Sequence, residues 1–161
     1  GVRSQPGRGS VFSIEVPAGS LAHALPRREF PAPLPNDSLA SALVVVVENQ
    51  VDILAGMREL LEGWGCRVLT AGDGRTATLE LARLGRAPDI VVADYHLDDG
   101  LTGVAVIEHI RCACAREIPA MIITADRSPA LLETVRNRGL HLLKKPLKPA
   151  KLRALMSHLL A

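Results

Sequence analysis

Apolar runs alternate with amphipathic segments along most of the chain, from about residue 42 to its end. Short runs rich in Val, Ile and Leu predict strands, and longer segments with apolar positions three or four apart predict helices. The expected strands cover residues 43–47, 67–71, 89–93, 119–123 and 140–144. The expected helices cover residues 50–63, 74–86, 103–115, 128–138 and 149–160.

Two of these helices show which side they should bury. In the first, Val51, Leu54, Arg58 and Leu61 lie along one side. In the last, the matching stripe consists of Leu152, Leu155, Met156 and Leu159.

The regular order of strand and helix predicts the fold class. Strands joined by helices are expected to pair in parallel, and right-handed crossovers place helices on both faces of the sheet. The sequence therefore predicts an α/β fold with a doubly wound five-stranded parallel sheet. In such sheets, ligands bind beyond the carboxyl ends of the strands.

Three zones divide the chain. Residues 1–17, GVRSQPGRGSVFSIEVP, contain a glycine-rich turn and then an alternating, strand-like run over residues 11–16. Residues 18–41 hold four prolines among small and polar residues and are expected to form a linker. Residues 42–161 contain the strand and helix repeats and are expected to form the main domain.

Composition narrows the function classes. Of the 161 residues, 48% are hydrophobic but only 2% are aromatic, so an aliphatic core is expected. The net charge of +2 is too small to argue for nucleic acid or membrane binding, and no apolar run approaches the ~20 residues of a membrane span. Three cysteines without framework spacing favour a reducing compartment, hence the cytoplasm. His109 and Cys112 could share a helix face, but two ligands do not make a closed metal site.

Polar residues follow four of the expected strands. Glu48 and Asn49 follow the first, Asp94 the third, Thr124 the fourth and Lys145 the fifth. Carboxylate and amide oxygens suit Mg²⁺, and an aspartate can carry a phosphoryl group covalently. A lysine and a threonine hydroxyl can bind phosphate oxygens. This set of side chains predicts a site for a phosphoryl group and a divalent cation.

Residues 42–161 resemble the receiver domain of two-component response regulators. The stretches that carry the resemblance are IVVADYHLDDGLTG (90–103), MIITADRS (121–128) and LLKKPLKPAKLRALM (142–156). The resemblance implies a flavodoxin-like (βα)5 fold with strand order 2-1-3-4-5. It also implies that phosphohistidine donates the phosphoryl group in a phosphorelay.

Site roles follow from the same resemblance. Asp94 would be the phospho-acceptor, Thr124 the switch hydroxyl and Lys145 the phosphate-pairing lysine, with a cis bond between Lys145 and Pro146. Mg²⁺ would be the cofactor, bound by Glu48, Asn49, Asp94 and the backbone carbonyl of His96.

A second resemblance lies at the amino end. GRGSVFSIEVP (7–17) is similar to the last glycine motif and closing strand of the ATPase domain of sensor histidine kinases. Together with the linker and the receiver, this gives the order of a hybrid histidine kinase. The fragment itself is expected to lack kinase activity, because most of the ATP site and the phospho-donor histidine box are missing. The expected partners are a histidine kinase core, in the same or another chain, and a histidine phosphotransfer protein. Nucleic acid binding and membrane contact are not expected.

Two positions depart from the receiver pattern. Asn49 stands where a second acidic residue is usual, so we expect Mg²⁺ to bind more weakly than in a typical receiver. Leu142 stands where a switch aromatic is frequent, so we expect any output change to use the backbone around residues 124–128. An alternative function is therefore a docking or inhibitory module that does not cycle phosphate. An FMN-binding protein is disfavoured, because ENQVD (48–52) replaces a phosphate-binding loop.

Simpler roles are open for several of the polar residues. Thr124 could cap the fourth helix, and Asp98 and Asp99 are expected to form a turn before Gly100. The cations between Lys144 and Arg153, other than Lys145, are expected to form a solvated face that could also meet an acidic partner.

Overall fold

The computed structural model describes residues 1–15, 39–97, 100–126 and 128–161. The chain divides into two compact units, residues 1–30 and 31–161. The predicted turn at Asp98 and Asp99 and most of the predicted linker lie outside the described residues.

The first unit contains a β-hairpin. Strand β1 (Val2–Gln5) pairs antiparallel with β2 (Gly9–Phe12), and Gly7 and Gly9 adopt positive φ angles of 74° and 94° at the turn. The predicted strand over residues 11–16 overlaps β2 only at Val11 and Phe12, and the described residues 13–15 are not part of a strand. Strand β2 begins earlier because it pairs with β1, which the polar sequence VRSQ does not reveal, and it stops at Phe12, opposite Val2. Val16 lies outside the described residues.

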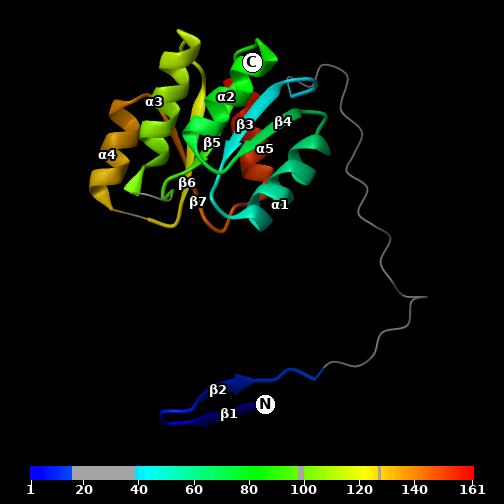
Figure 1. Ribbon diagram of the computed structural model, residues 1–161, viewed down its shortest axis with the longest axis vertical. Coiled ribbons are helices and arrows are strands. Elements are labelled where there is room, and N and C mark those ends of the chain that lie inside the picture. The colour runs from blue at the N-terminus through cyan, green and yellow to red at the C-terminus, as the bar shows by residue number, and fades with distance from the viewer. Residues whose placement is uncertain (16–38, 98–99, 127) are drawn as a thin grey trace, which may run out of the picture. The chain divides into compact units, whose positions relative to one another are not determined.

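The second unit contains five strands and five helices that alternate along the described chain (Figure 1). The strands are β3 (Leu43–Val47), β4 (Arg67–Ala71), β5 (Ile90–Asp94), β6 (Ala120–Thr124) and β7 (His141–Lys144). The helices are α1 (Val51–Glu62), α2 (Gly74–Leu84), α3 (Gly103–Cys114), α4 (Pro129–Asn137) and α5 (Pro149–Leu159). All ten elements match a predicted segment to within a few residues.

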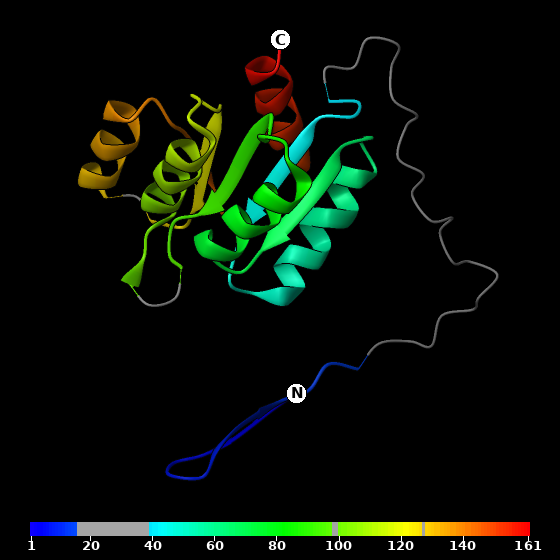
Figure 2. The ribbon, with the colours of Figure 1, turned by 45° about the horizontal axis from the view of Figure 1, so that its top comes forward.

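The five strands form one parallel sheet in the order β4-β3-β5-β6-β7 (Figure 2). Counted within this unit, the order is 2-1-3-4-5, so the predicted flavodoxin-like topology is confirmed. Helices α2, α3 and α4 pack on one face, and α1 and α5 pack on the other.

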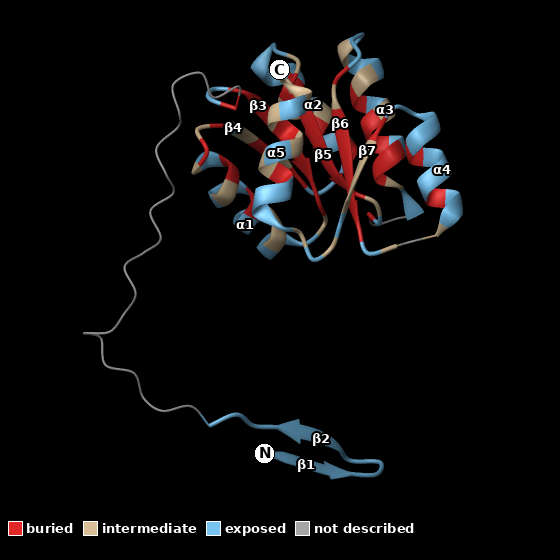
Figure 3. Ribbon diagram, turned by 180° about the vertical axis from the view of Figure 1, so that it is seen from behind, coloured by how far each residue is buried: buried red, intermediate tan, exposed pale blue. Residues whose placement is uncertain are grey.

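The central strands are buried on both faces (Figure 3). Successive side chains of a strand point to opposite faces of a sheet. Along β3, Val45 and Val47 therefore join the core beneath α2, α3 and α4, whereas Val44 and Val46 join the core beneath α1 and α5. This two-sided burial explains why the strands read as continuous apolar runs rather than as alternating ones.

The predicted helix stripes are correct for α5 and partly wrong for α1. In α5, Leu152 and Met156 are fully buried. In α1, Met57 and Leu61 are buried, but Val51 in the first turn is 76% exposed. The Arg58 guanidinium lies outside the core and donates a hydrogen bond to the Thr70 hydroxyl.

Residues just before β3 also belong to the core. Leu39 is fully buried with the side chains beneath α1 and α5, although the predicted domain begins at residue 42. The backbone around it is held against the turn that follows α1, since the Ser41 N–H donates to the Gly65 carbonyl (2.8 Å).

Side-chain caps fix the starts of three helices on one face. Asp73 caps α2, Thr102 caps α3 and Ser128 caps α4. The backbone N–H of Thr76, 2.8 Å from Asp73 Oδ1, is the main reason that the pKa of the Asp73 carboxyl lies below its usual value. Each cap satisfies a backbone N–H that the first turn of the helix leaves without a partner.

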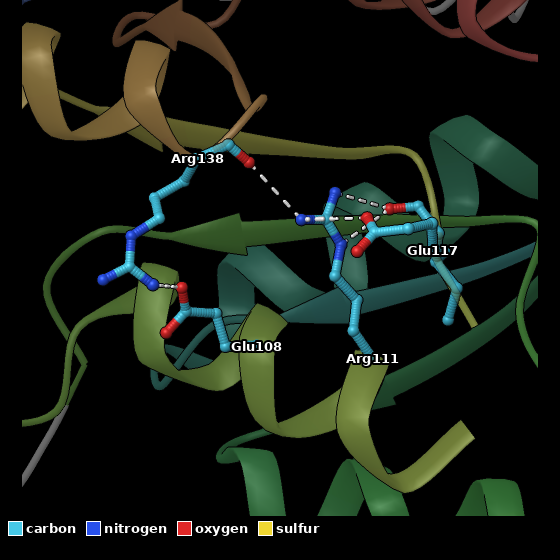
Figure 4. A network of polar contacts seen from close by, with 5 residues as sticks. Glu108, Arg111, Glu117 and Arg138 are labelled. Carbon is cyan, nitrogen blue, oxygen red and sulfur yellow. Dashed lines mark hydrogen bonds and ion pairs between the residues drawn. The ribbon is translucent and has the colours of Figure 1, made fainter. Parts of the chain in front are cut away.

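A polar cluster around Arg111 ties α3 to the loop before β6 and to the end of α4 (Figure 4). Arg111 donates from Nε (3.0 Å) and Nη2 (2.8 Å) to the carbonyl of Ile118, and from Nη1 (3.4 Å) to the carbonyl of Arg138. Its Nη1 also lies 3.5 Å from the Glu117 carboxylate. The Arg138 guanidinium in turn pairs with Glu108 on α3. This cluster, called the Arg111 clamp below, holds the end of α4 against α3.

None of the helices within the described ranges is both long and apolar enough to cross a membrane.

Candidate functional site

Four polar side chains meet at the carboxyl end of the sheet. Asp94 and Thr124 are the last residues of β5 and β6, whereas Glu48 and Lys145 directly follow β3 and β7. Because the strands are parallel, these positions share one edge of the sheet. Glu48, Asp94 and Thr124 are buried, with relative exposures of 3%, 8% and 1%. The buried polar residues of this unit therefore gather where sequence analysis expected a ligand site.

Lys145 bridges the two carboxylates. Its Nζ lies 2.9 Å from Asp94 Oδ1 and 3.2 Å from Glu48 Oε2. Glu48 Oε1 accepts a hydrogen bond from the backbone N–H of Gln50 (3.2 Å), at the start of α1. Glu48 is thus held from two sides, and Asp94 lies against the same ammonium.

The charges of this cluster do not cancel. Burial alone lowers the pKa of the Lys145 ammonium, but the hydrogen bond and charge of Asp94, together with those of Glu48, outweigh burial and raise it. Lys145 is therefore charged at neutral pH. With both carboxylates ionised, two negative charges face one positive charge. The excess negative charge favours an additional cation at this site.

The Thr124 hydroxyl is oriented by the chain that follows it. Its Oγ1 accepts the backbone N–H of Asp126 (3.0 Å), so the hydroxyl proton is available for another acceptor. The Asp126 carboxylate accepts hydrogen bonds from the N–H (2.8 Å) and hydroxyl (3.1 Å) of Ser128. Ser128 is the residue that caps α4, so the alternative in which Thr124 caps this helix is wrong.

Asn49 directly follows Glu48 along the chain, and His96 lies two residues after Asp94. Asn49 is half-buried and lines a cavity of about 270 Å³ with Asp73, Gly74 and Leu97. His96 lies opposite Thr102 in an isolated bridge, whose hydrogen bonds run from Gly103 N to Tyr95 O (2.9 Å) and from Leu97 N to Leu101 O (3.2 Å). The His96 carbonyl takes part in neither of these bonds.

The oxygen donors present fit a hard divalent cation. Two carboxylates, an amide oxygen and a backbone carbonyl are the ligand types that Mg²⁺ accepts, usually together with water. Across the described ranges, no group of three His, Cys, Asp or Glu side chains is placed to hold a metal ion. Cys112 is exposed on α3, outside this cluster.

Gly103 supports Asp94 in a way that sequence analysis missed. A Cβ built on Gly103 would lie 2.1 Å from the Asp94 carbonyl oxygen and 3.0 Å from the Ile122 Cδ1 atom. Only glycine fits here, so α3 can begin directly against the backbone of the strand that carries Asp94. A glycine directly after the capping Thr102 was the available signal, but glycine is also common in plain turns.

An apolar cavity of about 220 Å³ adjoins the cluster on the side of α1. Glu48, Asp94 and Lys145 form one part of its lining. The remaining walls are apolar and come from Val46, Val47, Ile53, Met57, Val92, Ile123, Pro146 and Leu147. The peptide bond between Lys145 and Pro146 is cis, as expected. Leu142 stands where receivers often have a switch aromatic. It is half-buried and packs against the core beneath α2, α3 and α4.

Residues 44–157 match the family model described as the response regulator receiver domain. Among curated proteins, the chain is 27% identical over 117 residues to the phyllosphere-induced regulator PhyR of Methylorubrum extorquens. It is 33% identical over 119 residues to the transcriptional regulatory protein ZraR of Escherichia coli O157:H7. Each match covers 73% of this chain, but only 43% of PhyR and 26% of ZraR.

Solved structures agree on the fold. The chemotaxis protein CheY4 of Vibrio cholerae superposes with a TM-score of 0.66 at 24% identity, over 74% of this chain and 99% of that one. A response regulator receiver domain protein from Clostridium thermocellum gives a TM-score of 0.66 at 21% identity, over 74% and 94%.

Proposed function

Because the chain belongs to the response regulator receiver domain family, we propose that it accepts a phosphoryl group on Asp94 in two-component signal transduction. The observation that carries this proposal is the 2.9 Å contact between Lys145 Nζ and Asp94 Oδ1 inside a buried, acidic cluster. An aspartate in a salt bridge with a lysine is ionised, as a nucleophile must be, and the lysine stands ready to bind a phosphoryl oxygen.

The proposed transfer uses this arrangement as follows. A carboxylate oxygen of Asp94 attacks the phosphorus of a phosphohistidine, the P–N bond breaks, and the leaving imidazole nitrogen takes up a proton from solvent. Lys145 offsets the charge on the phosphoryl oxygens, and the Thr124 hydroxyl donates a hydrogen bond to one of them. When bound by Glu48, Asn49, Asp94 and the His96 carbonyl, Mg²⁺ supplies further positive charge to the same oxygens.

We further propose that the parent protein is a hybrid histidine kinase located in the cytoplasm. The similarity of residues 7–17 to the end of a kinase ATPase domain supports this, as does the antiparallel pairing of β1 with β2, which gives this segment a strand partner. The phosphoryl donor would be a histidine kinase core, and the product would be hydrolysed or passed to a histidine phosphotransfer protein.

Asn49 supports a second candidate function, a docking or inhibitory module that does not cycle phosphate. An amide keeps an oxygen ligand but lacks the charge of a carboxylate. On this candidate, Mg²⁺ binding is too weak for phosphoryl transfer, and the domain acts through protein contacts alone.

Incubation with acetyl phosphate and Mg²⁺, followed by intact mass measurement, separates the two candidates. We expect an adduct of one phosphoryl group that is lost in Asp94→Asn and kept in Asp52→Asn, which changes an exposed carboxylate on α1. Failure to form any adduct at saturating Mg²⁺ would overturn the phosphoryl-accepting role and favour the docking module.

The weak-metal hypothesis has its own test. We expect Asn49→Asp to bind Mg²⁺ more tightly than the wild type, measured by shifts of the Glu48 and Gln50 amide resonances. Equal affinities in the two proteins would show that residue 49 does not contribute a metal ligand.

A further inference from the structure

Charge is distributed unevenly along the second unit. All four lysines of the chain lie between residues 144 and 151, in KKPLKPAK, and no Asp or Glu follows Glu133. These lysines cover the end of β7, the loop after it and the first turn of α5. The segment around the start of α5 therefore carries several cations and no carboxylates.

The lysines differ from the arginines in their pairing. Five arginines form ion pairs with nearby carboxylates: Arg58, Arg83, Arg86, Arg111 and Arg138. Lys145 is paired with Glu48 and Asp94. Within the part of the chain that the structure describes, no carboxylate lies in ion-pairing distance of the exposed Lys144, Lys148 or Lys151. Their charges are therefore available to a partner.

These residues line a groove of about 470 Å³, called the lysine groove below. Its walls are Leu142, Leu143, Lys144, Lys145, Pro146, Leu147, Lys148 and Lys151. Half of these side chains are apolar and half are cationic, so the groove offers carbon surface between ammonium groups. The groove runs beside β7, which is the edge strand of the sheet, and no further strand of the described chain covers it.

We propose that the lysine groove binds an acidic segment of a partner protein that also carries apolar side chains. Unpaired ammonium groups would bind its carboxylates, and the leucines and proline would bind its apolar residues. Among the residues that line the groove there is no aromatic ring for base stacking and no arginine for phosphate forks, which disfavours nucleic acid.

The lysine groove adjoins the cavity beside Asp94, because Lys145 lines both. A segment bound there would bring its own protein next to Asp94. That this partner is the donor or acceptor of the phosphoryl group rests on the proposed function. Binding itself does not, since it requires no phosphorylation.

The test uses a short fluorescein-labelled peptide of alternating Glu and Leu, with a Gln–Leu peptide as the uncharged probe and anisotropy as the readout. We expect the Glu–Leu peptide to bind and the Gln–Leu peptide to bind much more weakly. The variant with Lys144, Lys148 and Lys151 all changed to Gln should lose about tenfold in affinity, as expected for three exposed charge pairs.

A matched control changes Arg67, Arg75 and Arg116, three exposed cations outside the groove, to Gln. Equal weakening in the control variant would overturn the proposal, because net charge alone would then explain binding. Unchanged affinity in the lysine variant, or equally tight binding of labelled oligothymidine by the wild type, would also overturn it. Acetyl phosphate labelling of the same variants reports separately on Asp94, so loss of the proposed function and loss of docking are distinguishable.

Discussion

Strand β6 has a cation at each of its ends, and the two cations are held in different ways. Before the strand begins, the guanidinium of Arg111 binds the carbonyls of Ile118 and Arg138. Where the strand ends, the Lys145 backbone N–H donates to the Thr124 carbonyl (2.9 Å), and the Lys145 ammonium binds two carboxylates. Arg111 and Lys145 are both largely covered, with side-chain exposures of 16% and 30%.

The difference lies in what each cation binds. Arg111 donates its hydrogen bonds to backbone carbonyls, which are neutral, are fixed by the fold and cannot titrate. The Glu117 carboxylate, 3.5 Å from its Nη1, is 88% exposed and adds little. The Arg111 clamp therefore suits a permanent structural role. Carboxylates carry charge, and an incoming cation or phosphoryl group can change their pairing. The Lys145 cluster therefore suits a reaction, and its partners are the residues that the proposed function uses.

Removal of the Arg111 clamp should have the largest effect on stability. Arg111→Met leaves the buried Ile118 carbonyl without its two hydrogen bonds from a charged donor, so we expect a loss of about 3 kcal/mol in the free energy of unfolding. Urea unfolding measures this loss. Arg116→Met, on an exposed neighbour, should change it by less than about 0.5 kcal/mol. Because the clamp lies at the far end of β6, the acetyl phosphate adduct on Asp94 should remain. A stable Arg111→Met protein that no longer accepts phosphate would contradict this division of roles.

Disruption of the close contact between Gly103 and Asp94 should have the second-largest effect on stability. A methyl group on Gly103 must displace the backbone of β5 or the start of α3, so we expect Gly103→Ala to cost about 2 kcal/mol and to slow labelling of Asp94. Gly56 on α1 is the matched control, because a Cβ there meets no atom within 4 Å. Gly56→Ala should stabilise the protein by about 0.5–1 kcal/mol. Equal unfolding free energies for the two variants would show that the chain relaxes around Gly103.

The sequence was sufficient for the elements that repeat a simple pattern. The runs that became β3, β5 and β6 are apolar except at the last residues of β5 and β6, Asp94 and Thr124, and such runs predict strands buried on both faces. Asp94 and Lys145 could be placed at one edge because parallel strands bring their carboxyl ends together. The 2-1-3-4-5 order, by contrast, came from the resemblance to receivers.

Contacts between distant segments could not be read in the same way. Arg111 binds backbone carbonyls, and Gly103 lies against the backbone of Asp94. Every residue has these backbone groups, so the pattern of side chains does not predict such contacts. Val51 was expected on the buried side of α1 from helical spacing, but it is the first residue of this helix and is 76% exposed. The strand β1 was missed because its residues are exposed and mostly polar; they pair with β2 through the backbone and through the Ser4 and Ser10 hydroxyls (2.7 Å), and neither contact gives an apolar pattern.

The response of Lys145→Met to Mg²⁺ should distinguish the Lys145 cluster from the Arg111 clamp. The change leaves Glu48 and Asp94 without their shared cation, and we expect a loss of about 1–2 kcal/mol, less than for a fully buried pair because Lys145 is partly exposed. Added Mg²⁺ should restore more stability to this variant than it adds to the wild type, since it replaces the missing positive charge. Urea unfolding with and without Mg²⁺ measures this. Arg111→Met should gain no more from Mg²⁺ than the wild type does, and an equal gain in all three proteins would contradict the prediction.

The pH dependence should give the smallest effect. The pKa of Lys145 is higher in the folded protein than its ordinary value of 10.5, so the folded state holds this proton more tightly than the unfolded chain does. Its contribution is therefore fully present below pH 10.5 and is lost as the pH rises through the folded pKa. The difference in unfolding free energy between the wild type and Lys145→Met should stay constant from neutral pH to about 10.5 and then shrink. The difference between the wild type and Arg111→Met should stay flat over the same range, because a guanidinium keeps its charge there. Shrinkage of the Lys145 difference near neutral pH would contradict the raised pKa.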